Sequence, residues 1–510
     1  MSSKASVVSI LTETAKRFPK KDALVLGPTR VPYAAVKDQA MRYGAVLKSR
    51  GIGPGDRVAI LMPNIPHFAF AYYGALATGA SVVPIHALLK ADEMEYILRD
   101  SNAKALIAAS MLLGEGAPAA RAIGIPLFGV LDGCPEEIDR MEALAQAATP
   151  LTTYLPRDPQ DEAVILYTSG TTGKPKGAIL THDNILWNVN VTAFDTIQMQ
   201  SDDVLIGALP LFHSFGQTVV LNSGFRVGAT IALVPRFEPG PAFELLISEK
   251  VTIFAGVPTM FIALLEAAKA NPVKPPLRLA VSGGAALPVA IIEKTKEVFG
   301  IDIYEGYGLS ETSPVATFNQ ERYGRKPGSI GCPIWGIDVE IANAEIQDRI
   351  ELMPTGERGE IVIRGHNVFK GYLNKPEATA EAIVDGWFRS GDVGIKDEDG
   401  FLFIVDRTKD MIIRGGFNVY PREIEEVMNR YEGVKQVAVF GIPDSTHGEE
   451  IIAAVIAEPG LDSEALKNWT KEHVGAYKYP REIHLVDAMP LGPSGKVLKR
   501  VLTEEYSRKS

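Results

Sequence analysis

Short apolar runs bounded by turn-forming residues recur along the first 330 residues, and segments of helical length separate them. The runs include "VAILM", "SVVPI", "ALIAAS", "VILYTSG", "VLIGALP", "ATIALVP", "TIFAGVP" and "LRLAVSGGA". Buried strands that alternate with helices are typical of parallel α/β layers. This part of the chain is therefore predicted to have an α/β fold.

Residues 58–89 carry no Lys, Arg, Asp or Glu and are numerous enough to span a bilayer. Three prolines, Asn64 and His67 cut this stretch into "VAILM", "HFAFAYYGALATGA" and "SVVPI". Prolines and glycines fall where a strand, a helix and a second strand would turn into one another. A βαβ unit is therefore predicted here instead of a membrane span.

The pattern changes near residue 331, where short alternating strands such as "GEIVIRG" and "GFLFIVDR" lie between loops rich in Gly, Pro and Asp. A smaller β-rich section is predicted there. After the charged "DRTKD", a plausible linker, residues 411–431 predict a strand, a Gly-Gly turn and a helix that begins at Pro421. Two further strands and a helix over 463–473 complete an α+β pattern of about 100 residues, enough to fold alone.

Composition narrows the class of protein. With 510 residues, 46% apolar and 22% charged, the chain is typical of a globular protein. Its net charge of -10 and the lack of a dense basic block argue against nucleic acid as a partner. Cys134 and Cys332 are far apart, which predicts neither a disulfide framework nor a zinc site. The amino-terminal segment lacks the apolar core of a signal peptide, so a cytoplasmic location is expected.

The segment "YTSGTTGKPKGAILTH", residues 167–182, lies between an apolar run and a helix expected from Asn184. Its glycines let backbone amides approach an anion, while hydroxyl groups and lysines add donors and charge. It is not a Walker loop, because Thr168 stands where the first glycine belongs and a proline follows Lys174. Polyphosphate binding is predicted; a Gly/Ser/Thr surface loop is the alternative.

A second cluster is "YEGYGLSETSP", residues 304–314. Tyr307 could lie against a purine and Ser310 could bond a phosphate. Glu311 could hold Mg²⁺, because hard divalent cations prefer carboxylate ligands. A helix start capped by Ser310 and Glu311 explains the same residues.

Two single residues complete the candidates. Asp392 in "WFRSGDVG" could accept hydrogen bonds from ribose hydroxyls, although Asp in such a turn commonly stabilises the turn itself. Lys496 in "LGPSGKVLKR" lies on a glycine-flanked loop near the end of the chain. Taken alone, it would be a solvated surface lysine.

Together and in this order, the four motifs resemble the adenylate-forming superfamily of acyl-CoA synthetases, non-ribosomal peptide adenylation domains and beetle luciferases. The resemblance extends from "GIGPGDRVAILMPN" through "PLFHSFG" and "GERGEIVIRG" to "GPSGKVLKR". It implies an N-terminal portion, residues 1–407, of two α/β subdomains and a small β-barrel (about 331–407). It also implies a mobile α+β domain over 408–510, with the hinge near Lys409.

The resemblance also implies roles for individual residues. ATP-binding residues would be Thr168, Ser169, Gly170, Thr171, Thr172, Gly173, Lys176, Gly284, Ala285, Glu305, Gly306, Tyr307, Ser310, Asp392, Arg407 and Lys496. Among them, the segment from Thr168 to Lys176 would clasp the β- and γ-phosphates, and Asp392 and Arg407 would fix the ribose. Glu311 would bind Mg²⁺, Lys496 would reach the acid's carboxylate and the α-phosphate, and Gly415 and Gly416 would line the CoA channel.

The implied chemistry uses ATP, Mg²⁺ and coenzyme A. A carboxylate and a polyphosphate repel each other, so catalysis must come from positioning and charge neutralisation. Attack on the α-phosphate would give acyl-AMP and pyrophosphate, and a thiol, reactive as thiolate, would displace AMP. No serine elbow of the G-x-S-x-G type is present.

No charged residue lies between Asp203 and Arg226, so a pocket there would suit an apolar group. His213, counted with the catalytic candidates, is interpreted as a wall or gate of that pocket. The segment looks most like bacterial medium- or long-chain fatty acyl-CoA ligases. Aryl-CoA ligases of the benzoate or 4-coumarate type, an acyl-AMP ligase serving a carrier protein and a binding module without catalysis are the alternatives. Peripheral membrane contact and a homodimer stay open.

Overall fold

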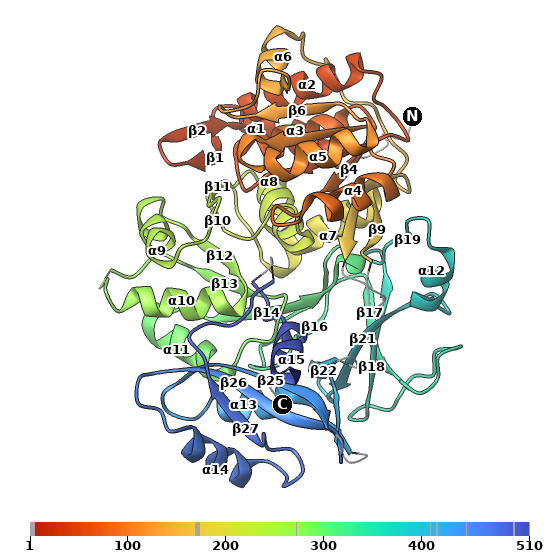
Figure 1. Cartoon of the computed structure of the whole chain (residues 1–510). Helices are drawn as coiled ribbons and strands as arrows, with labels where there is room; N and C mark the ends of the chain where they lie inside the picture. The colour runs from red at the N-terminus through yellow and green to blue at the C-terminus, as the bar shows by residue number, and fades with distance from the viewer. Residues whose placement is uncertain are drawn as a thin grey trace.

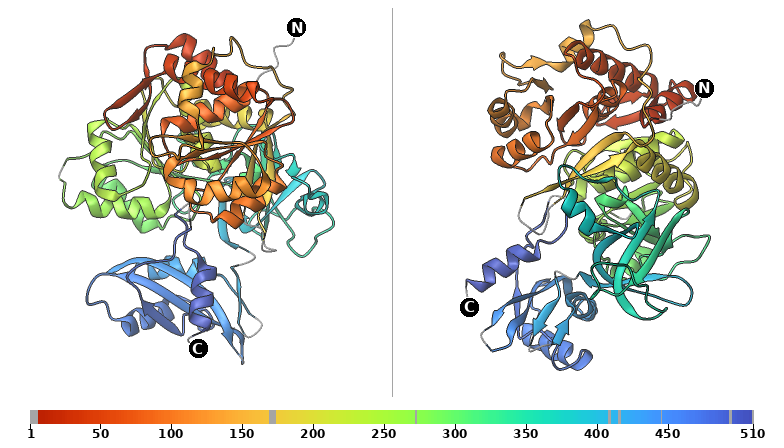
Figure 2. Two further views of the ribbon diagram at one scale, coloured as in Figure 1. Left: turned by 45° about the horizontal axis from the view of Figure 1, so that its top comes forward. Right: turned by 90° about the vertical axis from the view of Figure 1, so that its right-hand side faces the viewer.

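The computed structural model describes residues 6–168, 174–271, 273–407, 410–414, 417–444, 446–492 and 495–508, without the side chains of residues 406, 407 and 418. Two large sheets with packed helices form most of the N-terminal portion, and a smaller sheet follows them (Figure 1). The last hundred residues form a separate lobe at one end of the molecule, which both views of Figure 2 show (blue).

The first large sheet has nine strands, parallel at its centre and antiparallel at both edges. Its order is β16 (Cys332–Pro333), β15 (Val315–Phe318), β14 (Ile303–Gly308), β13 (Leu279–Ser282), β12 (Ile253–Gly256), β10 (Val204–Gly207), β11 (Thr230–Leu233), β1 (Asp22–Leu26) and β2 (Thr29–Pro32).

The second large sheet has eight strands, of which β9 and β19 are antiparallel to their neighbours. Its order is β19 (Gly371–Tyr372), β9 (Lys176–Thr181), β8 (Glu162–Thr168), β4 (Ser81–Pro84), β3 (Arg57–Leu61), β5 (Ala105–Ala109), β6 (Leu127–Val130) and β7 (Asp139–Arg140).

Helices cover these sheets, and several begin with proline, whose fixed φ suits a first turn. Those of the first half are α1 (Val8–Arg17), α2 (Tyr33–Ser49), α3 (Pro66–Ala77), α4 (Ala91–Asp100), η1 (Ser110–Leu112), α5 (Leu113–Ile123), α6 (Met141–Ala147), α7 (His182–Asn190), η2 (Val191–Thr196), η3 (Gly216–Asn222) and α8 (Ser223–Val227). The remainder of this portion holds α9 (Pro239–Ser248), α10 (Pro258–Ala268), α11 (Val289–Phe299), η4 (Ser310–Thr312) and α12 (Pro376–Ala382). Both η2 and η3 are π-helical.

The predicted βαβ unit at residues 58–85 is confirmed as β3, α3 and β4, with every residue of α3 buried except His67. Its aromatic side chains belong to the main core: Phe68, Tyr72 and Tyr73 are fully buried. Among the described helices, none has both the length and the apolar composition that crossing a bilayer requires.

The β-rich section is a five-stranded antiparallel sheet made of β17 (Ile337–Ala342), β18 (Arg358–Gly365), β20 (Ile383–Val384), β21 (Trp387–Lys396) and β22 (Leu402–Arg407). The last lobe has its own sheet and its own apolar clusters. Its elements are β23 (Ile412–Arg414), β24 (Phe417–Val419), α13 (Pro421–Met428), β25 (Val434–Asp444), β26 (Gly448–Ala457), α14 (Ser463–His473), β27 (Glu482–Leu485) and α15 (Lys499–Ser507). The α/β fold with a small α+β domain is therefore confirmed.

Two of the strands that were not predicted flank segments that the sequence analysis singled out. Strand β9 follows β8 as an antiparallel hairpin partner, so the phosphate motif is a hairpin connection and not a strand-to-helix loop. Strand β24 pairs with β23 on the far side of the Gly-Gly turn. Both are short segments next to glycine-rich turns, where the apolar pattern is too brief to separate a strand from a loop.

Candidate active site

The phosphate motif joins the ends of β8 and β9, where Thr168 and Lys176 are register partners. Ser169, Gly170, Thr171, Thr172 and Gly173 lie outside the described residues. On the described side of the connection, the Lys174 ammonium lies 5.2 Å from the centre of the Tyr96 ring, and the Tyr96 hydroxyl donates to the Pro175 carbonyl at 3.1 Å. This end of the hairpin is thus held against helix α4.

Glu311 is the point where several candidates meet. It is buried on the short helix η4, and its Oε1 accepts hydrogen bonds from the hydroxyls of Thr168 at 3.2 Å and Tyr372 at 2.9 Å. Ser310, beside it, has its hydroxyl 3.4 Å from that of Ser214. The structure therefore brings the β8 end of the phosphate motif together with the second motif.

Tyr372 was missed by the sequence reasoning, because one aromatic residue in "FKGYLN" carries no recognisable signal. Its ring centre lies 5.3 Å from the Lys176 ammonium, while its hydroxyl bonds Glu311. Burial, and next the charge of Glu311, raise the pKa of the Tyr372 phenol well above its ordinary value. The phenol therefore stays protonated and remains a hydrogen-bond donor at neutral pH.

The donor set around Glu311 fits Mg²⁺. Among the described residues, Oε2 of Glu311 accepts no hydrogen bond, and no cluster of three metal-binding side chains occurs. Mg²⁺ is commonly held by one or two carboxylates together with substrate phosphates. A single carboxylate with a spare oxygen next to a phosphate motif matches that pattern.

Strand β14 carries Glu305 and Tyr307 on its buried face, because alternate residues of a strand point the same way. The Tyr307 hydroxyl donates to Oδ2 of Asp392 at 2.6 Å. Gly306, between them, packs so closely that a Cβ there would lie 2.6 Å from the Phe318 ring. Two candidates far apart in the sequence, Tyr307 and Asp392, are therefore in direct contact.

Asp392, expected in a turn, lies within strand β21 instead, next to an irregularity in its pairing with β18. A buried ion pair, also missed by the sequence reasoning, holds this part of β21. The Arg389 guanidinium binds Oε2 of Glu360, with both side chains buried, and the other oxygen of Glu360 accepts from the Gly391 amide at 2.9 Å. Asp392 is also the register partner of Arg407 across β21 and β22, although the Arg407 side chain is not described. This part of β21 is thus fixed by its own sheet.

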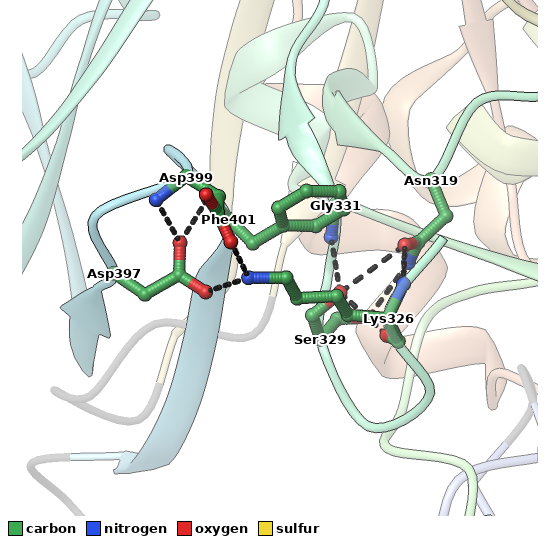
Figure 3. Close-up of polar contacts among 7 residues, drawn as sticks. All are labelled: Asn319, Lys326, Ser329, Gly331, Asp397, Asp399 and Phe401. Atoms are coloured by element: carbon green, nitrogen blue, oxygen red, sulfur yellow. Dashed lines mark hydrogen bonds and ion pairs between the residues drawn. The ribbon is translucent and has the colours of Figure 1, made fainter. Parts of the chain in front are cut away.

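A second set of contacts, shown in Figure 3, holds the opposite end of the same hairpin. The Lys326 ammonium lies 2.5 Å from Oδ2 of Asp397, 2.6 Å from Oδ2 of Asp399 and 4.7 Å from the Phe401 ring centre. The backbone of Lys326 donates in turn to Oδ1 of Asn319 at 3.1 Å. The loop after β15 therefore braces the tip of the β21 and β22 hairpin.

Glu305 has other partners than the Tyr307 and Asp392 pair. Its Oε2 accepts from the Gly328 amide at 3.2 Å, and burial raises its pKa to about 7, an effect that the charge of Arg422 on α13 partly offsets. The Glu305 carboxyl group therefore lies between the loop after β15, which carries Gly328, and the C-terminal domain, which carries Arg422. Its assignment to ATP binding stays a prediction.

Lys496 reaches the N-terminal portion from the C-terminal domain. Its Cε is 3.4 Å from the place that a Cβ on Gly284 would occupy, at a glycine with φ of 82°, and the Gly495 carbonyl accepts from the Thr259 hydroxyl at 3.2 Å. Ala285, the next residue, is exposed. The described part of the lysine loop is thus docked beside Gly284.

Lys496 lines a small cavity. The other residues that line it are Leu209, Pro210, His213, Phe215, Gly216, Val257 and Gly284. Its volume is about 10 Å³, room for about one water molecule. Burial, and next the charge of Lys496, lower the pKa of His213 to about 4, and its Nδ1 accepts from the Phe215 amide at 3.2 Å. His213 is therefore a neutral wall residue at physiological pH.

Lys409, Gly415 and Gly416 lie outside the described residues, so the proposed hinge and CoA channel stay predictions.

Comparison with known proteins identifies the family. The profile described as "AMP-binding enzyme" matches residues 11–373, and the profile described as "AMP-binding enzyme C-terminal domain" matches residues 423–496. The chain is 36% identical to a long-chain-fatty-acid–CoA ligase of Bacillus subtilis, covering 98% of this chain and 94% of that protein. It is also 36% identical to a feruloyl-CoA synthase of an Amycolatopsis species, covering 95% and 96%.

Among solved structures, ATP-bound MatB from Rhodopseudomonas palustris superposes with a TM-score of 0.90 at 31% identity, covering 99% of both chains. Both N- and C-terminal parts of the fold are included at that coverage. The chain therefore belongs to the AMP-binding enzyme family, as an AMP-forming acyl-CoA synthetase, an acid–thiol ligase.

Proposed function

We propose that the chain activates a medium- or long-chain fatty acid as acyl-AMP, with release of pyrophosphate, and then transfers the acyl group to CoA. The observation that carries this proposal is the position of Lys496, which joins an apolar cavity to the groups around Gly284. A cation at that junction suits a reaction in which a carboxylate must approach a phosphate.

Two sides of the site are distinguished by the groups that form them. The nucleotide side consists of β14, η4 and β21, where Tyr307 and Asp392 would bind adenosine, with Arg407, Gly284, Ala285 and Gly306. The phosphates would be held by the segment 168–176 and Ser310. The acyl side consists of residues 209–222 and Val257, with His213 as a wall. Residues 209–222 carry no charged side chain and are largely buried.

In the first step a carboxylate oxygen would attack the α-phosphate, and the bond between the α- and β-phosphates would break. Lys496 would neutralise charge on the carboxylate and the α-phosphate, an electrostatic contribution that is largest in a site shielded from water. Mg²⁺, held by Glu311, would neutralise phosphate charge. Lys176 would hold the departing pyrophosphate from the other strand of the hairpin.

In the second step the CoA thiolate would attack the acyl carbonyl and AMP would leave. Lys496 fills part of the cavity in the described orientation, so a thiol needs a different arrangement. We assign this change to rotation of residues 408–510 against residues 1–407 about Lys409, which would bring Gly415 and Gly416 to the channel.

We propose a fatty acid as the substrate because the acyl side carries no charge, and because one relative is named for long-chain fatty acids. The feruloyl-CoA synthase at equal identity keeps an aryl-CoA ligase as the second candidate. An acyl-AMP ligase that serves a carrier protein is the third. A cytoplasmic location, peripheral membrane contact and a homodimer stay predictions.

A panel of straight-chain and aromatic acids, read as AMP and pyrophosphate release with and without CoA, tests the proposal. We expect CoA-dependent AMP release, highest with straight-chain acids. Highest rates with benzoate or 4-coumarate would favour the aryl-CoA ligase. Acyl-AMP formation without transfer to CoA would favour the carrier-protein ligase, and release of ADP would refute the mechanism.

A further inference from the structure

Tyr372 lies between the two charged groups that would hold the ends of the polyphosphate. Its ring centre is 5.3 Å from the Lys176 ammonium, and its hydroxyl is 2.9 Å from Oε1 of Glu311. The two charges therefore contact opposite parts of one side chain.

The sheet and a neighbouring ring hold Tyr372 in this position. Its backbone pairs with Ala178 of β9, so the residue belongs to the same sheet as the phosphate hairpin. Its amide donates to the Thr379 hydroxyl at 2.9 Å, and its ring packs edge-on against Phe369 with centroids 4.8 Å apart. The direction of the side chain is therefore set by contacts other than those with Lys176 and Glu311.

Separation of the two charges has an energetic consequence. A direct ion pair between Lys176 and Glu311 would have to break before either could bind ATP, and its cost would be subtracted from the affinity. Among the described residues, Lys176 forms no ion pair with any carboxylate. A contact between a cation and an aromatic ring that is partly open to solvent is weak, so it is easily exchanged for phosphate.

We propose that Tyr372 is a positioning residue for MgATP. Its hydroxyl fixes Oε1 of Glu311 and leaves Oε2 for the metal, and its ring keeps Lys176 from pairing with that carboxylate. Hydrogen bonds from outer groups commonly orient the side chains that hold a metal. The inference rests on the proposed function, in which Glu311 holds Mg²⁺ and Lys176 the phosphates.

The test compares Tyr372→Phe with Tyr372→Leu by calorimetric titration of ATP, with and without Mg²⁺. Tyr372→Phe removes only the hydroxyl, so we expect MgATP to bind about tenfold more weakly and metal-free ATP to bind as in the wild type. Tyr372→Leu also removes the ring, so we expect weaker binding of both forms, because Lys176 can then reach Glu311. The KM for the acid should change in neither variant.

Tyr33→Phe is the matched control, since it also removes one hydroxyl that donates a hydrogen bond, here to the Ala229 carbonyl at 2.6 Å outside the site. Its affinity for MgATP should equal that of the wild type. Tyr372→Phe should add nothing in a Glu311→Gln background, because the two groups act as one unit.

Two outcomes separate the inference from the proposed function. If Glu311→Gln removes the effect of Mg²⁺ on ATP binding but Tyr372→Phe does not weaken MgATP, the role of Tyr372 is wrong and the metal assignment stands. If Glu311→Gln leaves the effect of Mg²⁺ unchanged, the metal assignment itself is wrong, and the inference is overturned with it.

Discussion

The nucleotide side and the acyl side of the site are held together by different kinds of contact. On the nucleotide side, Tyr307, Glu311 and Asp392 each take part in a side-chain hydrogen bond to a residue at least 60 positions away, and the buried pair of Arg389 and Glu360 fixes strand β21. On the acyl side the cavity has room for about one water, and the residues that line it before Gly216 lead directly into a buried π-helix. Binding of a fatty acid, the proposed substrate, would therefore require the acyl side to move, whereas the described residues of the nucleotide side already contact one another.

Lys496 lies where the two sides meet, so its removal tests whether they act together. For Lys496→Ala we expect acid-dependent pyrophosphate release to fall by about 10²- to 10³-fold, the usual loss when one group that stabilises developing charge is removed. Conversion of supplied acyl-AMP and CoA to thioester should continue, because that step does not need the lysine. Wild-type rates in both half-reactions would contradict the assignment.

Asp392→Asn tests the nucleotide side alone. Tyr307 would lose a charged acceptor, and hydrogen bonds to charged groups contribute about 1.5–3 kcal/mol. We expect the KM for ATP to rise at least tenfold while the order of preference among acids is retained. A changed order of preference would show that the two sides are not separate. Ser390→Ala, two residues before Asp392, serves as a control for damage to strand β21.

The two sides should also differ in how pH affects stability. The pKa of His213 is lowered to about 4 from 6.5, so its contribution is present above pH 6.5 and is lost as pH falls through 4. The pKa of Glu305 is raised to about 7 from 4.5, so its contribution is present below pH 4.5 and is lost as pH rises through 7.

Thermal unfolding of His213→Asn and Glu305→Gln between pH 4 and 8 measures this difference. Relative to the wild type, we expect His213→Asn to gain stability toward low pH and Glu305→Gln toward high pH, by about 3 kcal/mol each. Parallel curves for either variant and the wild type would contradict the burial of that group. His86 and His182, whose pKa values are also lowered to about 4 by burial, should keep both variants acid-sensitive.

Phe215→Ala should have the smallest effect and test the acyl side alone. The ring lines the cavity and packs against Gly283, where a Cβ would lie 3.2 Å from it. Its removal enlarges the cavity, so we expect a few-fold shift of kcat/KM toward bulkier acids, in the range that small changes in apolar pockets produce. An altered KM for ATP with an unchanged acid preference would place Phe215 on the nucleotide side.

The sequence predicted motifs that the structure brings together on the nucleotide side, whereas it did not predict the shape of the acyl side. Motifs such as "GYGLSETSP" are recognisable because phosphates, ribose and metal, the proposed ligands, demand particular donors and acceptors. Strand β9, which pairs with β8 across the phosphate motif, was not predicted. The roles of Tyr372, Arg389 and Glu360 were missed as well. Their roles depend on contacts across sheets, which no local pattern encodes.

The preference among acids could not be predicted, because many different sets of apolar side chains of suitable volume can form an apolar wall. Only the shape of residues 209–222 and their neighbours decides which acid fits, and that shape comes from packing.

The π-helical turn at Gly216–Asn222 gives the acyl wall a route for evolutionary change. Each residue of a regular α-helix turns the chain by about 100°, and a π-helical turn contains one residue more than the α-helical turn it replaces. A deletion of one residue within this segment could restore regular geometry while presenting a different set of side chains to the acid. Descendants of this enzyme could thus exchange substrates through a change in length, with the chemistry of ATP untouched.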